Sequence, residues 1–259
     1  MAWTRSPSAA LRTVALPRAA LLASLCAALA ACALAPEPIK QTQTPAPSAA
    51  RPDAIHRFVR ESSSGPGWTM RLEYPTFPAL DAPTAKIRAF VEAAKSDFVT
   101  ASIANDRAWA ATATAAEKGL RRPPHEMILE WKAGSLGPRW LSLELHRYWW
   151  VGGAHGEDEI LSVNYDISAG RFLELADILP PSAQPLEYVA GIARAELLRR
   201  FSSIPGIAPW IERGTAPNSA NYACFTFDDR SITIHFARYQ VGPGSNGLVD
   251  VVIPRGPQS

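Results

Sequence analysis

The sequence predicts an α+β protein with antiparallel sheets and segregated helices. Apolar residues alternate in several short runs, as in strands that bury one face, whereas residues 81–118 and 185–201 show helical spacing. Strand runs kept apart from helices are typical of the α+β class. We expect two intimately packed lobes, residues 55–124 and 125–259, because about 200 residues bury enough surface to fold without disulfides.

The first predicted elements are a strand and a long helix. Apolar residues alternate over residues 68–75, where Pro75 closes the strand. Helical spacing then runs from Asp81 to about Lys118, which predicts an amphipathic helix with a break near Asn105. Its predicted buried residues are Ile87, Phe90, Val91, Ala94, Phe98 and Ile103.

A hairpin and a series of shorter elements follow. Residues 127–131 and 141–145 alternate as two strands, with the turn between Gly134 and Gly137. The helix over residues 185–201 is expected to bury Ala190, Ala193, Leu197 and Leu198. The other predicted elements are a strand over 160–166, a turn over 168–170, extended structure over 172–175, a strand over 223–227, a turn over 228–230, and strands over 232–236 and 248–253.

Residues 1–31 have the composition of a secretory signal peptide. Three arginines precede an apolar run from Ala19 to Ala31, which is shorter than the ~20 residues of a membrane-spanning helix. The run ends in LAAC, which resembles a bacterial lipobox and makes Cys32 the expected lipidation site. The ALA that ends at residue 30 would also suit an ordinary signal peptidase, and this alternative stays open.

Charge and cysteine content narrow the possible environments of the folded part. Without the three leader arginines, the 26 basic residues no longer outnumber the 24 acidic ones, so no nucleic-acid partner is expected. Cys26 lies in the leader and Cys32 at the lipid site, which leaves Cys224 without an internal disulfide partner. Residues 32–54 are rich in proline and alanine and predict an extended tether.

The stretch YWWVGGAHGEDE, residues 148–159, gathers groups that carry chemistry. Its glycines suit a connection that needs positive φ or a close backbone approach. His155 is a candidate general base or loop organiser, and the acids after it suit a basic partner. The candidate ligand-binding residues are Tyr148, Trp149, Trp150, Gly152, Gly153, His155, Glu157, Asp158 and Glu159.

Each of these groups also has a structural interpretation. The His155 ring can hold loop carbonyls or a carboxylate, and acids after a turn can form a solvated rim. Since neighbouring strand residues point to opposite faces, one of Trp149 and Trp150 is expected in the core. The other would serve as a stacking platform for sugar or an anchor for a protein, and the sequence leaves open which ring it is.

The sequence contains no catalytic or cofactor signature that we recognise. It lacks a Gly-x-Ser-x-Gly elbow, a His-Glu-x-x-His helix, a phosphate loop and a dinucleotide fingerprint, and we expect no metal or cofactor. The motif TFDD at residues 226–229 resembles that of NodB-type deacetylases, but no His-x-x-x-His pair accompanies it. We interpret it as a hairpin turn, since aspartate favours turns, and we interpret Cys224 as a small buried hydrophobe.

Three stretches, taken in order, resemble the DUF3298 family: YWWVGGAHG, NYDISAGRFLELADIL and CFTFDDRSITIHFARYQVGPGSNGLVDVVIP. The LEYP strand and the long helix before them resemble its N-terminal companion, DUF4163, so the resemblance covers about Gly67 to Pro254. Relatives of this kind include the extracellular domain of the anti-sigma factor RsiV, which implies lysozyme binding, and the N-terminal region of the peptidoglycan deacetylase PdaC. Neither relative implies a reaction for this region itself.

Together these features predict a lipid-anchored bacterial envelope protein without enzymatic activity. It is expected to bind a lysozyme-like protein or a glycan of the cell wall. The alternative is a peptidoglycan-acting hydrolase with His155 as general base, which would need a perturbed carboxylate in a cleft. Ala33 is not the aspartate that retains lipoproteins in an inner membrane, so an outer-membrane anchor facing the periplasm is expected.

Overall fold

The computed structural model describes residues 56–179 and 184–255. The predicted signal peptide, Cys32 and the tether over residues 32–54 lie outside these residues. Among the described helices, none is both long and apolar enough to cross a membrane. In chain order the described elements are β1(Arg57–Gly65), β2(Trp68–Thr76), α1(Asp81–Thr112), α2(Ala115–Lys118), β3(His125–Leu136), β4(Trp140–Trp150), β5(Glu157–Asp166), β6(Arg171–Phe172), α3(Leu175–Ile178), α4(Pro185–Arg200), α5(Ala208–Gly214), η2(Ser219–Tyr222), β7(Phe225–Phe227), β8(Ser231–Phe236), η3(Gly244–Asn246) and β9(Val249–Pro254).

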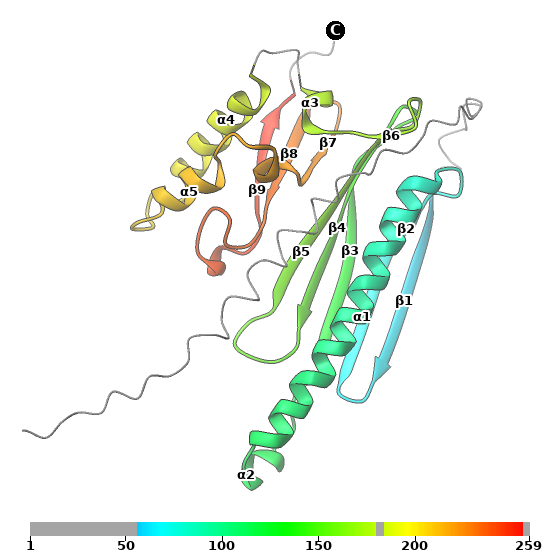
Figure 1. The fold of residues 1–259 in the computed structure, drawn as a ribbon, viewed down its shortest axis with the longest axis vertical. Helices are drawn as coiled ribbons and strands as arrows, with labels where there is room; N and C mark the ends of the chain where they lie inside the picture. Colours follow the sequence, from blue (N-terminus) through cyan, green and yellow to red (C-terminus); the bar gives the residue numbers. More distant parts are fainter. Residues whose placement is uncertain (1–55, 180–183, 256–259) are drawn as a thin grey trace, which may run out of the picture. The chain divides into compact units, whose positions relative to one another are not determined.

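The predicted α+β class is confirmed, with a first sheet of six strands in the order β1-β2-β3-β4-β5-β6. Strands β2 and β3 run parallel, so the prediction of purely antiparallel sheets is wrong for this pair. The reason is that helix α1 lies between them in the chain and returns it to the same end of the sheet (Figure 1). Strands β3 to β5 share this sheet with β2, although the expected lobe boundary lies between residues 124 and 125.

Strand β1 is missing from the sequence-based prediction. Its sequence, RFVRESSSG, has only two large apolar residues and no sustained alternation. It pairs with β2 through a tight turn at Pro66 and Gly67, where Gly67 has a φ of 78° that favours glycine. The Pro-Gly pair is thus the one local signal that marks this hairpin.

Helix α1 covers one face of the first sheet (Figure 1). The predicted buried stripe is confirmed at four positions, but Ile103 is exposed and Phe90 is only partly buried. The stripe continues at Ser102, because a residue four positions after Phe98 keeps the same side of the helix toward the sheet. The helix residues buried in this first core are Ile87, Val91, Ala94 and Phe98.

The break in the helical region also lies later than predicted. Helix α1 continues through Asn105 and ends at Ala113, whose backbone is extended. Thr114 and Glu117 then form a capping box, in which each side chain accepts a hydrogen bond from the backbone N–H of the other residue. This pair starts a separate short helix, α2, and explains the break.

The turn of the β3–β4 hairpin occupies residues 137–139. The predicted turn at 134–137 is therefore placed too early and shares only Gly137 with the observed turn. Gly134 lies inside β3, where the register with β4 shifts between Ala133 and Ser135. A Cβ atom at Gly134 would come within 2.6 Å of the Phe227 carbonyl oxygen. This glycine therefore permits a close approach between the backbones of β3 and β7.

The second sheet is antiparallel, in the order β7-β8-β9, and forms a second core with helices α4 and α5. Helix α4 buries Ala190, Ala193 and Leu197 as predicted, while Leu198 is exposed. Asp228 accepts hydrogen bonds from the backbone N–H groups of residues 230 and 231, which confirms the predicted hairpin turn. Residues 173–175 do not extend the strand after β6, because α3 begins at Leu175.

Polar side chains of the first sheet bond to the backbone of β7. Asn164 donates to the Phe225 carbonyl at 2.7 Å, and Ser142 accepts from the Phe227 N–H at 2.8 Å. Ser142 also donates to the side-chain oxygen of Asn164 at 2.7 Å. The first two hydrogen bonds take the place of strand pairing between β7 and the first sheet, since buried backbone groups need partners, and the third holds the two side chains in position.

Candidate functional site

The predicted loop residues lie at the end of β4, in the connection over residues 151–156, and at the start of β5. Gly152 and Gly153 have φ values of 102° and 89°, where most side chains are strained. A Cβ atom at Gly156 would collide with the ring of Tyr148. The glycines therefore have the predicted roles, two through positive φ and one through close approach.

His155 holds the loop through its ring nitrogen. Nδ1 lies 3.1 Å from the Gly156 carbonyl oxygen and 3.3 Å from a carboxylate oxygen of Glu157. The His155 side chain is 53% exposed and lines neither of the two cavities described below. These contacts agree with the loop organiser that the sequence suggests.

The three acids after His155 each lie next to a cation of the same chain. Glu157 and Asp158 each lie 3.7 Å from an Arg238 nitrogen, and Glu159 lies 2.6 Å from Arg147. Asp158 also lies 2.9 Å from the His146 ring. Their charges are therefore largely compensated within the protein. This compensation weakens the attraction that the acids would offer to a basic partner.

Arg147, Trp149 and Glu159 point toward helix α1. Burial lowers the pKa of Arg147 and raises the pKa of Glu159, so desolvation outweighs their mutual attraction. The Arg147 guanidinium also stacks on the Trp149 ring, 4.1 Å from its centre, and Trp149 packs against the first core. Of the two neighbouring tryptophans, Trp149 is thus the one that belongs to the core side.

Tyr148 and Trp150 lie on the opposite face of the sheet, because strand residues alternate. Trp150 is half-buried, and its indole N–H donates to the Gly153 carbonyl at 3.1 Å. Its ring also meets the edge of the buried His125 ring. Trp150 is therefore held in place but keeps part of its surface accessible.

The face of the first sheet that points away from helix α1 is partly covered, because β7 and β8 pack against Ser142, Glu144 and Asn164 on this side. We call the uncovered part of this face, over β1 to β3 and the ends of β4 and β5 near their connection, the open face. Its residues alternate with Met70, Leu72, Met127 and Leu129, which are buried under the helix. The strand register places the open-face residues in rows that cross the sheet. One row contains Ser62, Arg71, Ile128, Tyr148 and Asp158, and the next contains Ser64, Thr69, Glu126 and Trp150.

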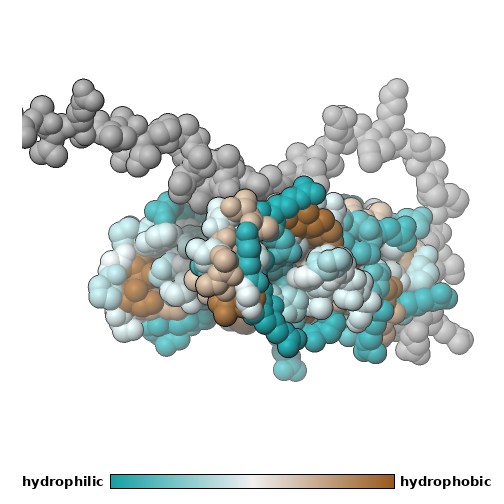
Figure 2. All heavy atoms as spheres, turned by 90° about the horizontal axis from the view of Figure 1, so that it is seen from below, coloured by the Kyte–Doolittle hydropathy of each residue, from teal (hydrophilic) through white to brown (hydrophobic). Residues whose placement is uncertain are grey.

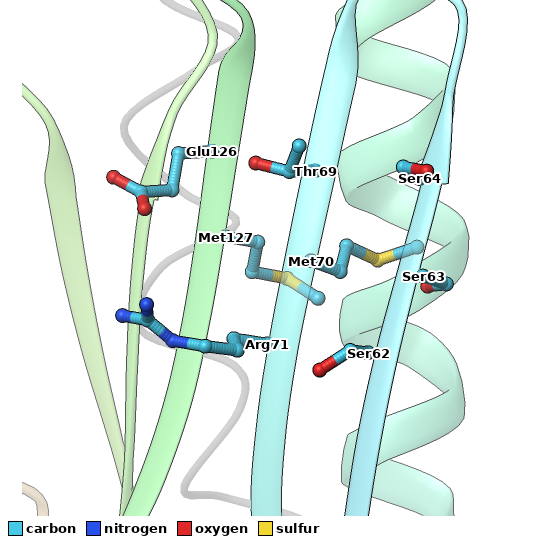
Figure 3. A pocket seen from close by; sticks show the side chains of 8 residues that line it. All are labelled: Ser62, Ser63, Ser64, Thr69, Met70, Arg71, Glu126 and Met127. Atoms are coloured by element: carbon cyan, nitrogen blue, oxygen red, sulfur yellow. The ribbon is translucent and has the colours of Figure 1, made fainter.

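A hollow of about 350 Å³ lies at strands β1 to β3 (Figure 3). Most of its lining belongs to the open face, and Figure 3 shows Arg71 and Glu126 extending to the same side from β2 and β3. Neither of these charged side chains forms an ion pair with any described residue, in contrast to the loop acids. The hollow thus offers polar groups that a ligand can use.

The end of the protein that carries α2 and the β4–β5 connection is poorly suited to a hydrophobic partner. Seen from this end, apolar residues form several separate patches between hydrophilic residues (Figure 2). A protein interface with an apolar centre needs a contiguous patch. This view favours a polar ligand over a hydrophobic partner at this end.

A triad of charged side chains joins the two sheets, with His235 and Glu144 buried and Asp250 about half exposed; we call it the buried triad after its central histidine. His235 of β8 lies 3.0 Å from a carboxylate oxygen of Glu144 in β4 and 2.8 Å from one of Asp250 in β9. Burial alone would lower the pKa of His235, but hydrogen bonds to Asp250 and Glu144 outweigh it and raise the pKa to about 9. The imidazole is therefore a cation between two carboxylates at neutral pH, and Lys132 lies 3.4 Å from Glu144 on the other side.

Sequence reasoning missed the hollow and the buried triad. Ser62 and Ser64 lie on the unpredicted strand β1, and Arg71 and Glu126 look like ordinary exposed strand positions. His235 stands at a polar position of the alternating strand, on the same face as Ser231 and Thr233, so the pattern does not mark it as buried. Among the described residues, no three histidine, cysteine or acidic side chains are grouped closely enough to hold a metal ion.

Two family models match the chain. Residues 67–158 match the model described as deacetylase PdaC, and residues 176–256 match the protein of unknown function DUF3298. Among curated proteins, the chain is 28% identical over 131 residues to the peptidoglycan-N-acetylmuramic acid deacetylase PdaC of Bacillus subtilis (strain 168). The alignment covers 51% of this chain and 28% of that protein, so this chain spans well under a third of its relative's length.

One solved structure supports the fold, and a second is less similar. A DUF3298 family protein from Pseudomonas aeruginosa PAO1 superposes with a TM-score of 0.50 at 18% identity, covering 79% of this chain and 93% of the other. A second DUF3298 family member, from Bacteroides fragilis NCTC 9343, gives a TM-score of 0.47 at 16% identity, covering 77% and 88%. The first of these likenesses supports the arrangement of elements and carries no information about a ligand.

Proposed function

Because the chain contains a DUF3298 domain preceded by a PdaC-like region, we propose that it is a non-enzymatic binding module of the bacterial cell envelope that recognises cell-wall glycan. The observation that carries the proposal is the open face of the first sheet. There a hollow with unpaired polar groups lies in the same rows as Tyr148 and Trp150. The PdaC-like match, residues 67–158, spans most of this face.

The open face has the chemistry that a sugar chain needs. Serine and threonine hydroxyls, with Glu126, can exchange hydrogen bonds with sugar hydroxyls. Arg71 offers a charged donor for a carboxylate, the group that distinguishes muramic acid from other hexosamines. Tyr148 and Trp150 add ring surface at one end of the rows, where the apolar face of a sugar can pack. These rows extend over several strands, which suits an elongated ligand.

The similarity to PdaC supports the same class of ligand. That relative is named for its action on N-acetylmuramic acid in peptidoglycan, and this chain matches 28% of its length. A region shared with a peptidoglycan enzyme fits a role in holding the polymer. Since activity belongs to that whole protein, we propose binding and not deacetylation for this chain.

We further propose that the module is anchored by lipid at Cys32 and held off the membrane by the tether over residues 32–54. An outer-membrane location facing the periplasm would bring the open face to peptidoglycan. The hydrolase alternative, with His155 as general base, gains little support from a half-exposed ring whose Nδ1 contacts Gly156 and Glu157. A general base works best beside a bound substrate from which water is excluded.

Glycan binding is expected to weaken when the hollow loses its charges. In calorimetric titrations with solubilised peptidoglycan strands, Arg71→Ala should reduce affinity by about tenfold, the loss of roughly one charge-assisted hydrogen bond. Chitohexaose, which lacks the muramic carboxylate, should bind more weakly and respond less to this change. The strands should keep their length during the same incubations, since we expect no hydrolysis.

Arg107→Ala provides the matched control, because Arg107 is an exposed arginine of α1, the helix that covers the other face of the sheet. It should leave affinity unchanged. Equal losses in both variants, or no binding by the wild type, would contradict the glycan proposal. Binding of lysozyme without binding of glycan would replace the glycan with a protein partner.

The anchor has its own test. Cys32→Ser is expected to leave the protein unlipidated and move it out of the membrane fraction, because the acyl chains supply the membrane affinity. Metabolic labelling with radioactive palmitate, followed by fractionation, measures both effects. Label that still enters the Cys32→Ser protein would show that the lipobox assignment is wrong.

A further inference from the structure

A second cavity, of about 440 Å³, lies between the two sheets. Strands β3, β4 and β5 form one wall, and β9 with the end of helix α4 forms the other. This volume is within the usual range of small-molecule sites. The charged and ionisable lining residues are Lys132, Glu144, His146, Arg200 and Asp250.

The two acids of this cavity belong to the buried triad. Each uses one carboxylate oxygen to contact His235, at 3.0 Å for Glu144 and 2.8 Å for Asp250. The Asp250 side chain is still 51% exposed, so part of its carboxylate faces the cavity and solvent. The His235 cation behind them keeps both acids in their charged form.

Two cations, Lys132 and Arg200, lie beside these acids. Lys132 approaches Glu144 at 3.4 Å but is 77% exposed, which leaves its ammonium free to reorient. Arg200 donates to the Asp250 backbone carbonyl at 2.8 Å and pairs with Glu196 of its own helix. A guanidinium has five N–H donors, so these contacts do not exhaust Arg200.

The remaining lining is largely apolar. Ile160 of β5 and Phe201 after α4 contribute partly buried side chains from opposite walls, and Leu248 and Val249 continue this surface. An alkyl group can therefore be covered between the charged ends. The two carboxylates would repel a simple anion, and Lys132 and Arg200 would repel a simple cation.

We propose that this cavity binds a small zwitterion, either a free amino acid or a short peptide with both ends unblocked. Its carboxylate contacts Lys132 and Arg200, its ammonium contacts Asp250, and a small side chain packs on Ile160 and Phe201. The site is separate from the hollow on the open face and does not rest on glycan binding there. A protein that failed to bind glycan would still bind the zwitterion.

Three matched probes test this assignment by protein-observed NMR: alanylalanine, its N-acetylated form and its C-terminal amide. We expect saturable shifts for residues of β4 and β9 with alanylalanine, and at least about tenfold weaker binding for each blocked form. Alanine as a fourth probe separates the two sources, because a site for free amino acids binds it as well as the dipeptide. Glycan strands without peptide should not compete.

Substitutions assign the contacts. Lys132→Met and Arg200→Met should each weaken alanylalanine by about tenfold, and Asp250→Asn should remove the preference for a free amino group. Arg199→Met is the control, since Arg199 pairs with the same Glu196 but does not line the cavity. Thermal melts verify that each variant folds. If Arg200→Met and Asp250→Asn destabilise the protein, Lys132→Met alone still tests the contact with the ligand carboxylate. Equal binding of blocked and unblocked probes, or no shifts up to about 10 mM, would overturn the proposal.

Discussion

Replacing His235 with leucine is expected to lower the free energy of unfolding by about 3–5 kcal/mol, the usual cost of breaking a buried ion pair from one side. His235 and Glu144 are each about 5% exposed, so the carboxylate that remains has little access to water. Lys132 lies 3.4 Å from Glu144 and recovers only part of the lost attraction. The effect is large because the imidazole contacts carboxylates from both sheets.

Urea unfolding at pH 7 measures this loss. Arg60→Ala serves as the control, because Arg60 forms an ion pair with Glu73 at 2.9 Å in which its own side chain is 75% exposed. Such an exposed pair contributes little to stability, because water screens the attraction between its charges. A His235→Leu protein that is as stable as the Arg60→Ala protein would show that the triad does not hold the sheets together.

The triad also gives stability a defined pH dependence. The pKa of His235 is raised to about 9 in the folded protein, against about 6.5 when unfolded. Its stabilisation is therefore complete below about pH 6.5 and is lost as the pH rises toward 9. Burial raises the pKa values of Glu144 and Asp250, but hydrogen bonds to His235 outweigh it and lower both. The stabilisation that these two carboxylates contribute is therefore lost only at acidic pH. His235→Gln should flatten the profile between pH 6.5 and 9.

Asn164→Leu is expected to destabilise the protein by about 2–4 kcal/mol, because it leaves two buried polar groups without partners. The carbonyl of Phe225 loses the 2.7 Å bond from the Asn164 amide, and the Ser142 hydroxyl loses its acceptor. Leucine fills a similar volume, so the loss reports mainly on hydrogen bonds. It should also loosen the contact between β7 and the first sheet.

Hydrogen exchange at the Phe227 amide is the specific readout of that contact. This N–H donates to Ser142, which Asn164 holds in place, so its exchange should accelerate more than that of amides inside helix α1. Thr69→Val, at an exposed strand position, should change stability by less than about 0.5 kcal/mol. Unchanged exchange at Phe227 in Asn164→Leu would contradict this role for the asparagine.

The buried triad shows why distant polar partners escape sequence reasoning. Glu144 and His235 are 91 positions apart and lie in different sheets. Their contact depends on how β7 and β8 are placed against β4, which no local pattern encodes. The same holds for the loop acids, since the arginines that pair with them are Arg147 of β4 and Arg238 after β8.

Sequence patterns alone were enough to predict the α+β class, the long helix after Asp81, the roles of the loop glycines, the Asp228 turn and the family resemblance. These follow from periodicity, turn chemistry and motifs, which act over a few residues and leave a local mark. Only the tertiary structure decided that β2 and β3 run parallel, that β1 completes the sheet, and that Trp149 faces the core while Trp150 lies on the open face. The physical reason is that strand register and the packing of a helix on one face fix which side is covered, and both depend on residues far apart in the chain.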